Sequence, residues 1–228
     1  MSVEPAETWI FGYGSLMWSP GFSFAEARRA KLAGFHRAFC VYSIHYRGTE
    51  RRPGLVLGLD RGGACDGIAF RVAPEARKAT LAYLRARELI YGVYREALLP
   101  VDLAHTECEP PRTVWATAYI AERCHPAYAG RLPLAREAHL IRRSIGRGGT
   151  NLEYLLSTRR HLLDLGIREP RLERLIALTG AGRMLRADAG RNTSGAVALA
   201  RAWALKPTRR PYTVRDNRFG YRAKLAGL

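Results

Sequence analysis

Residues 9–16 read WIFGYGSL, a bulky apolar run that ends in a pair of spaced glycines. The run Trp9-Ile10-Phe11 is typical of a short buried strand, and the first glycine marks where that strand opens into a tight loop. Glycines on either side of a tyrosine allow several backbone N–H groups to turn into one concavity, which binds an anion such as a carboxylate. The candidate binding residues are therefore Gly12, Tyr13, Gly14, Ser15 and Leu16.

A simple tight turn is the competing interpretation of this loop. The pattern is not a dinucleotide fingerprint, because Met17 stands where the third glycine belongs. It is not a nucleophile elbow either, because no glycine follows Ser15 by two positions. If Gly14 adopts a positive φ, Gly14→Ala should impair binding, and an unchanged KM would indicate a turn alone.

Further strands are predicted downstream of the loop, over residues 37–43, 55–59, 67–72, 96–101 and 114–120. The segment Asp60-Arg61-Gly62-Gly63 has hairpin turn chemistry, so a turn is expected between the second and third of these strands. Helical periodicity begins at Pro74 and is expected to end near Gly92. It returns over residues 134–145, 152–165 and 170–178, so the fold class is α+β with helices concentrated late.

Glu88 is the second candidate for chemistry because of its position on the predicted helix. Leu81, Leu84, Glu88 and Tyr91 follow at spacings of three, four and three, which places the carboxylate on the apolar face. It could simply pair with an arginine, the candidates being Arg85, Arg87 and Arg95. Alternatively, desolvation raises its pKa and makes it a general base that works near neutrality.

Composition indicates an ordinary globular chain of 228 residues that is 47% hydrophobic. The N-terminal MSVEPAET lacks a basic signal region, and no stretch approaches the ~18 apolar residues of a membrane span, so we expect a cytoplasmic protein outside the membrane. Cys40, Cys65, Cys108 and Cys124 contain no C-x-x-C pair, which favours a reducing compartment. The six histidines show no metal-ligand spacing, and we expect neither metal nor cofactor.

Positive charge is concentrated at the C-terminal end. Residues 180–228 hold eleven Arg and Lys against Asp188 and Asp216, a net of +9 out of the formal +17 of the chain. We expect one domain over residues 1–179 and an arginine-rich tail over 180–228, whose composition is compatible with partial disorder. The tail is either solubilising surface or a polyanion-binding arm, and the chain carries no recognised nucleic-acid-binding motif. The sequence does not predict an oligomeric state.

Five stretches stand in an order and spacing that resemble one known family: Phe11–Leu16, Arg47–Thr49, Arg52–Leu57, Arg87-Glu88 and Gly92–Tyr94. The resemblance is to the ChaC family of γ-glutamylcyclotransferases and covers about residues 9–179. It continues in the later segments Leu132–Leu134, Asn151–Leu155 and Leu165–Ile167.

This resemblance implies a small mixed β-barrel with packed helices, and cleavage of glutathione into 5-oxoproline and cysteinylglycine. It implies that Gly12–Leu16 form the pocket for the γ-glutamyl group and that Glu88 is the catalytic acid/base. The substrate would be a small molecule. Two alternatives remain open: a cyclotransferase for other γ-glutamyl amines or dipeptides, and a polyanion-binding protein without enzymatic activity on the same scaffold.

Overall fold

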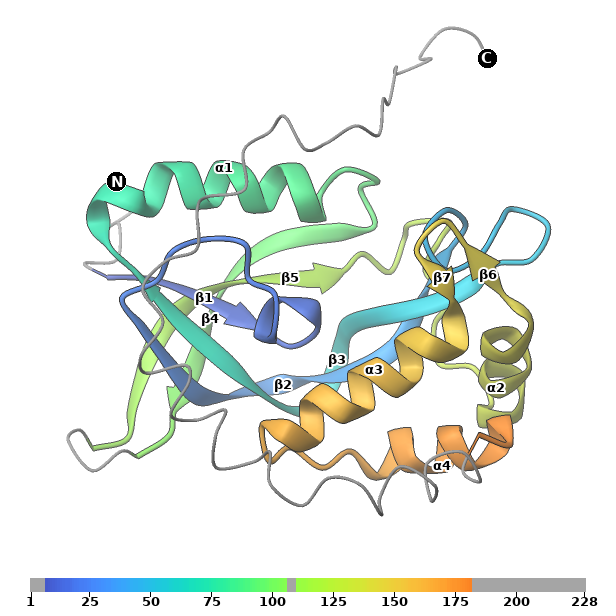
Figure 1. Ribbon diagram of the computed structural model, residues 1–228. Helices are drawn as coiled ribbons and strands as arrows, with labels where there is room; N and C mark the ends of the chain where they lie inside the picture. Colours follow the sequence, from blue (N-terminus) through green and yellow to red (C-terminus); the bar gives the residue numbers. More distant parts are fainter. Residues whose placement is uncertain (1–6, 106–109, 182–228) are drawn as a thin grey trace, which may run out of the picture.

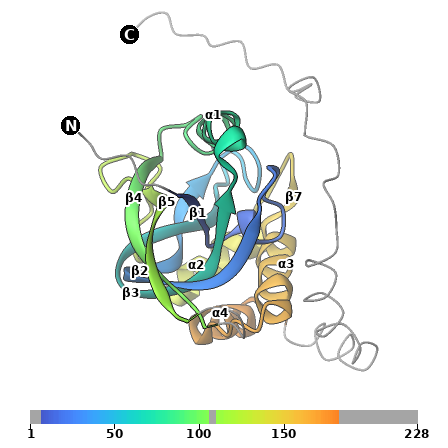
Figure 2. The same ribbon diagram turned by 90° about the vertical axis from the view of Figure 1, so that its left-hand side faces the viewer.

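The computed structural model describes residues 7–105 and 110–181 of the chain. In this part, five strands close into a barrel in the order β1-β3-β2-β4-β5 (Figure 1). Figure 2 shows the barrel end on, with α1 against one side and α4 against the opposite side. The predicted α+β barrel with packed helices is confirmed. The predicted tail after residue 180 lies almost wholly outside the described residues.

The barrel strands are mostly antiparallel, and the single parallel pairing joins β1 to β5 and closes the barrel. Each strand alternates buried and exposed positions where one face meets the core and the other meets solvent. The bounds are β1 Thr8–Gly12, β2 Glu26–Ser43, β3 Gly54–Val72, β4 Tyr94–Leu103 and β5 Arg112–Ala121. All five barrel strands thus overlap segments predicted from the sequence.

The predicted hairpin turn at residues 60–63 is wrong. These residues continue a single long strand, β3, which pairs with β2 along its whole length. The glycines do adopt positive φ, 98° at Gly62 and 70° at Gly63, and they lie opposite a register shift between Ala33 and Phe35 in β2. They therefore form a bulge, which bends two long strands around the barrel without breaking them. The connection between β2 and β3 is the loop of residues 44–53.

The helices follow their predicted positions closely, with one difference at the end of the first. A 3-10 turn, η2 Pro74–Ala76, leads into α1 Arg77–Glu88, which ends four residues before the predicted Gly92. Leu84 on α1 is fully buried, as its place on the apolar face predicts. Tyr91, predicted on the same face, lies beyond the helix end.

The later helices pack as a group. Their bounds are α2 Leu134–Arg143, α3 Asn151–Asp164 and α4 Pro170–Thr179, with the two-residue strands β6 Ile145–Gly146 and β7 Gly149–Thr150 between α2 and α3. A capping box joins Thr150 and Glu153 and begins α3. Asn151 is fully buried and exchanges two 2.7 Å hydrogen bonds with the backbone of Leu55, which fastens α3 to β3.

Candidate active site

The loop that follows β1 exposes backbone donors. Gly14 leads into the 3-10 turn η1 Ser15–Met17, in which the Met17 N–H donates to the Gly14 carbonyl at 2.9 Å. Among the described residues, no acceptor is found for the N–H groups of Gly14, Ser15 and Leu16. Three successive free N–H groups at a tight turn suit a carboxylate, as predicted for this loop.

The two loop glycines serve different purposes. A Cβ on Gly12 would lie 3.2 Å from Leu16 Cβ and 3.3 Å from the Met17 nitrogen, so a side chain here would require these neighbours to shift by a few tenths of an ångström. Gly14 has φ −128°, so the condition of a positive φ, under which Gly14→Ala was expected to impair binding, is not met. A Cβ at this position would make only an ordinary contact, 3.7 Å, with Leu57.

Arg37 fixes the position of the loop through a hydrogen bond to its backbone. Its side chain is 2% exposed, and its guanidinium donates to the Tyr13 and Asp66 carbonyl oxygens and pairs with the Glu169 carboxylate. A planar guanidinium that satisfies several acceptors at once is a rigid connector. The loop is therefore tied both to β3 and to the residue that precedes α4.

Glu88 is the last residue of α1, and its side chain is 19% exposed. Burial raises the pKa of its carboxyl, and the positive charge of Arg87 opposes that rise. The Arg87 Nε lies 3.1 Å from Glu88 Oε1, whereas Arg85 and Arg95 pair with other carboxylates. Both sequence interpretations therefore apply at once: Glu88 is paired with an arginine and its pKa is still raised.

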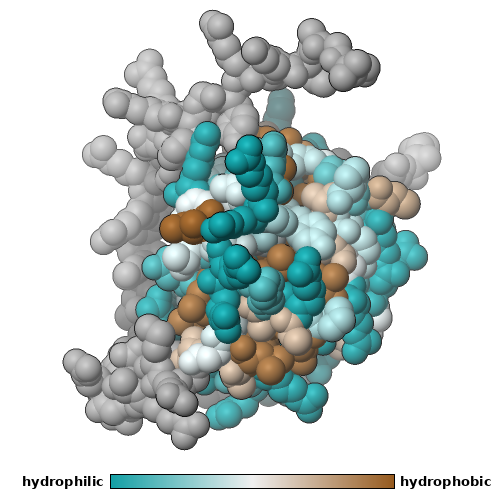
Figure 3. All heavy atoms as spheres, turned by 90° about the vertical axis from the view of Figure 1, so that its right-hand side faces the viewer, coloured by the Kyte–Doolittle hydropathy of each residue, from teal (hydrophilic) through white to brown (hydrophobic). Residues whose placement is uncertain are grey.

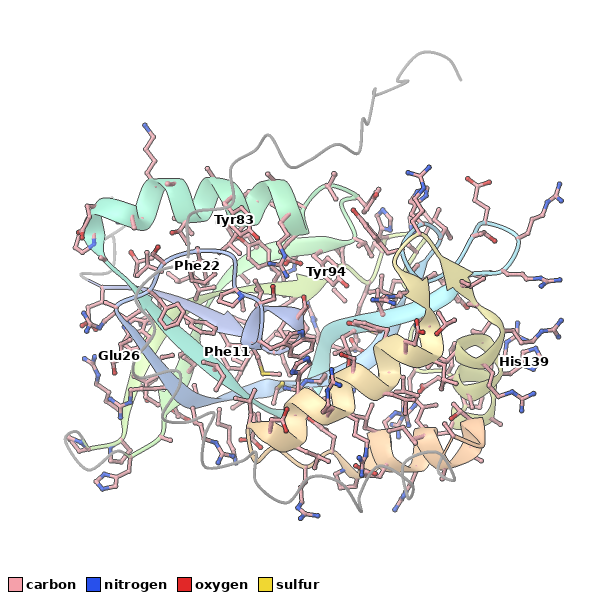
Figure 4. All side chains as sticks on the ribbon, viewed as in Figure 1. Phe11, Phe22, Glu26, Tyr83, Tyr94 and His139 are labelled. Atoms are coloured by element: carbon pink, nitrogen blue, oxygen red, sulfur yellow. The ribbon has the colours of Figure 1, made fainter. Side chains whose placement is uncertain are left out.

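Arg87 joins the two predicted halves of the site. Its Nη2 donates to Ser15 Oγ at 2.9 Å, and its Nη1 donates to the Ser19 carbonyl at 2.9 Å and to Tyr83 Oη at 3.1 Å. Figure 4 shows Tyr83 beneath α1, on the side that faces the segment after the loop. One guanidinium thus fixes the position of the Glu88 carboxylate relative to the loop.

Three tyrosines lie close enough to Glu88 for its charge to act on their pKa values. Burial raises the pKa values of Tyr13 and Tyr94 well above 10, and the negative charge of Glu88 adds to the rise. Burial also raises the pKa of Tyr154 to about 12. The Tyr94 hydroxyl donates to the Leu57 carbonyl at 2.7 Å, and Figure 4 shows this residue in the centre of the molecule. All three hydroxyls stay protonated at neutral pH.

Sequence reasoning did not assign Tyr94, Tyr154 or the bridging role of Arg87. Tyr94 begins β4, six residues after Glu88, whereas Tyr154 lies in α3, far from both Gly12 and Glu88 along the chain. Both lie in stretches that carry the family resemblance, 92–94 and 151–155, which is the signal that could have found them.

A separate hollow of about 370 Å³ is lined by residues of β2, β3, α2 and α4, and neither Glu88 nor the loop reaches it. Its buried carboxylates are already satisfied, since Asp60 accepts from Arg123 and Tyr128, and Glu137 pairs with Arg171. Within residues 7–105 and 110–181, no three His, Cys, Asp or Glu side chains gather as metal ligands would. Over the same residues, none of the helices has the length and apolarity needed to span a membrane.

Comparisons with known proteins agree on one family. The family model described as ChaC-like protein matches residues 8–181. The glutathione-specific γ-glutamylcyclotransferase of Escherichia coli K12 is 39% identical over 178 residues, which cover 77% of this chain and 75% of that protein. The human glutathione-specific γ-glutamylcyclotransferase 1 is 35% identical over 158 residues, 67% of this chain and 68% of that one. In fold, the crystal structure of the glutathione-specific enzyme from yeast matches with a TM-score of 0.68 at 21% identity, covering 78% of this chain and 96% of that one.

Proposed function

The chain belongs to the ChaC-like family, and we propose that it is a γ-glutamylcyclotransferase that cleaves glutathione into 5-oxoproline and cysteinylglycine. Its relatives in Escherichia coli and human carry the name of glutathione-specific enzymes over two thirds or more of their length. The observation that carries the proposal is the partly buried Glu88 carboxyl, which pairs with Arg87 beside a loop whose three N–H groups have no acceptor among the described residues.

The loop binds the substrate's α-carboxylate. The N–H groups of Gly14, Ser15 and Leu16 supply the donors, and burial near the barrel mouth strengthens hydrogen bonds to an anion. Binding this end of the glutamyl chain restricts its rotation and brings the α-amine towards the γ-carbonyl carbon. Restricting the glutamyl chain in this way lowers the activation free energy of the intramolecular attack by up to about 7–11 kcal/mol.

Glu88 carries the proton. The α-amine is protonated near neutral pH and must lose a proton before its lone pair can attack the γ-carbonyl. A carboxylate whose pKa is raised by burial accepts that proton more readily than an exposed one. After the attack the ring nitrogen loses its second proton to solvent, the C–N bond to the cysteine nitrogen breaks, and Glu88 returns the proton it took up to this leaving amine. One carboxyl therefore serves both steps.

The tyrosine hydroxyls support the negative charge that develops on the γ-carbonyl oxygen. Tyr13 is the best placed donor, because its hydroxyl has no acceptor among the described residues, whereas Tyr94 already donates to a backbone carbonyl. A protonated phenol in a buried site stabilises an oxyanion at no cost of reorganisation.

We place this activity in the cytoplasm, in keeping with the free thiols of Cys40, Cys65 and Cys124. The direct test is incubation of the purified chain with glutathione, followed by separate assays of 5-oxoproline and cysteinylglycine. Both products should appear in equal amounts. Release of glutamate in place of 5-oxoproline would indicate hydrolysis and contradict the proposal. Turnover of γ-glutamyl amines at the same rate as glutathione would favour the broader cyclotransferase.

A further inference from the structure

Arg47 lies in the loop that connects β2 and β3 and packs beside the candidate active site. Its guanidinium carbon is 5.3 Å from the centre of the Tyr154 ring, and its Nη1 donates to the Thr150 carbonyl at 3.2 Å. Its backbone N–H donates to Ser43 Oγ at 3.0 Å. Contacts of the backbone N–H at one end and of the guanidinium at the other therefore fix the direction of this side chain.

The backbone around Arg47 is also tightly confined. A Cβ on Gly48 would come within 2.2 Å of the Gly54 nitrogen and 2.5 Å of the Ser43 carbonyl oxygen. The residue next to Arg47 therefore packs directly against the backbone at the ends of both strands, where no side chain would fit.

The charge of Arg47 has no carboxylate partner. In the described part of the chain, no ion pair includes this residue, although it is only half exposed. The Glu153 carboxylate and the Arg47 guanidinium both border Gly149, but they form no ion pair, and Glu153 accepts the Thr150 N–H at 3.0 Å as part of the cap of α3. A half-buried guanidinium whose fork faces no anion is suited to binding one from a ligand.

A continuous set of contacts leads from the loop to Arg47. The Cβ position of Gly14 faces Leu57, whose carbonyl oxygen accepts the Tyr94 hydroxyl. Tyr154, over whose ring Arg47 lies, is also close enough to Glu88 for both charges to act on the pKa of its hydroxyl, Arg47 lowering it and Glu88 raising it. Figure 3 views the face that carries β6, β7 and the 44–53 loop, where hydrophilic side chains project into solvent.

We propose that Arg47 binds the glycine carboxylate of glutathione and so selects γ-glutamyl tripeptides over compounds that lack a carboxylate at this place. The inference rests on the proposed function. The cysteinylglycine half of the substrate spans about 7 Å when extended, the length of two residues. The terminal carboxylate of bound glutathione therefore lies beyond the glutamyl pocket, where a separate positive charge is needed to bind it.

The test compares glutathione with its glycinamide, which differs only in the loss of the terminal charge. The wild-type chain should show a kcat/KM about 10- to 150-fold higher for glutathione, the range of one hydrogen-bonded charge pair. Arg47→Met keeps a long apolar stem over the tyrosine ring and removes the charge. This variant should lose the preference, with kcat/KM for the glycinamide nearly unchanged. Arg51→Met, an exposed arginine of the same loop, is the matched control and should keep the wild-type ratio.

Two outcomes would overturn the assignment of Arg47 alone. Equal kcat/KM of the wild-type chain for glutathione and for its glycinamide would overturn the assignment. This measurement needs no variant, so it stands even if Arg47→Met fails to fold. Equal losses on both substrates in Arg47→Met, or a shifted acidic limb of its pH profile, would show that Arg47 acts on the protein or on Glu88. Absence of 5-oxoproline from either substrate with the wild-type chain would instead refute the proposed function, and the inference with it.

Discussion

Replacing Glu88 by glutamine removes the proposed proton carrier and little else. The carboxamide has the shape of the carboxyl, and the link between Arg87 and Ser15 Oγ at 2.9 Å does not depend on Glu88. The donors of the loop also remain in place. Glu88→Gln should therefore retain the fold and the substrate affinity while losing the ability to take up and return a proton.

The expected loss in turnover is about 10²- to 10⁴-fold, the range for one general acid/base group. The structure favours the upper part of this range, because no other carboxylate among the described residues pairs with Arg87 or lies in its place. The loss of the contact with Arg87 costs less than ~1 kcal/mol of folding free energy, since both side chains are partly exposed, at 26% and 19%. Removal of a partly desolvated charge offsets that cost.

The assay follows 5-oxoproline release under saturating and limiting glutathione, so that kcat and KM are separated. Glu173→Gln is the matched control, because it also removes a helical carboxylate that pairs with an arginine, at 2.8 Å from Arg159. The control should keep wild-type kinetics. Turnover by Glu88→Gln within a few-fold of wild type would refute the role given to Glu88, and a large rise in KM with unchanged kcat would make it a binding residue.

Arg87→Met removes the cation that lowers the pKa of Glu88 against the effect of burial, so this pKa should rise further. The acidic limb of the pH profile of kcat/KM should therefore move to higher pH. An unmoved limb would show that the two charges are not coupled. The folded-state pKa of Glu88 lies above its ordinary 4.5, so its stabilising contribution is complete below that value and lost as pH rises. Glu88→Gln should therefore gain in Tm over wild type at pH 8 and not at pH 4, as thermal unfolding at both pH values would measure. Gly12→Ala forces its Cβ to 3.2–3.3 Å from neighbouring atoms and should cost about 1–3 kcal/mol of stability in denaturant unfolding, whereas Gly14→Ala should stay near wild type. Asn151→Ala leaves a buried N–H and a buried carbonyl without partners and should cost about 2–6 kcal/mol; a loss below 1 kcal/mol would show that water replaces the amide.

The strands and helices were largely predictable because their signals are local. Trp9-Ile10-Phe11 forms a buried strand, and the helices after residue 134 lie where periodicity places them. The hairpin expected at Gly62-Gly63 was wrong because positive φ at glycine serves a bulge as well as a turn. Only the pairing of β2 with β3 on both sides of these residues distinguishes the two, and pairing is a property of the whole sheet.

Some features of the candidate site were predictable from local sequence patterns, and others were not. Gly12–Leu16 and Glu88 could be selected from the sequence, since a glycine loop after a strand and a carboxylate on an apolar helix face are local patterns. Arg87 could be named only as one of several candidate partners. Its reach to Ser15 joins residues 72 positions apart, and no local pattern contains that contact.

The sequence by itself indicated the loop, the carboxylate and most of the strands and helices along the chain, because short-range sterics and periodicity encode them, and it indicated the family through the resemblance of its motifs. Tertiary structure alone decided which arginine holds Glu88, which tyrosines face it, and that Arg47 carries a charge without a carboxylate partner in the described chain. Burial and charge depend on every neighbour in space, and closing the barrel is what brings β1, α1, β4 and α3 around one carboxyl group.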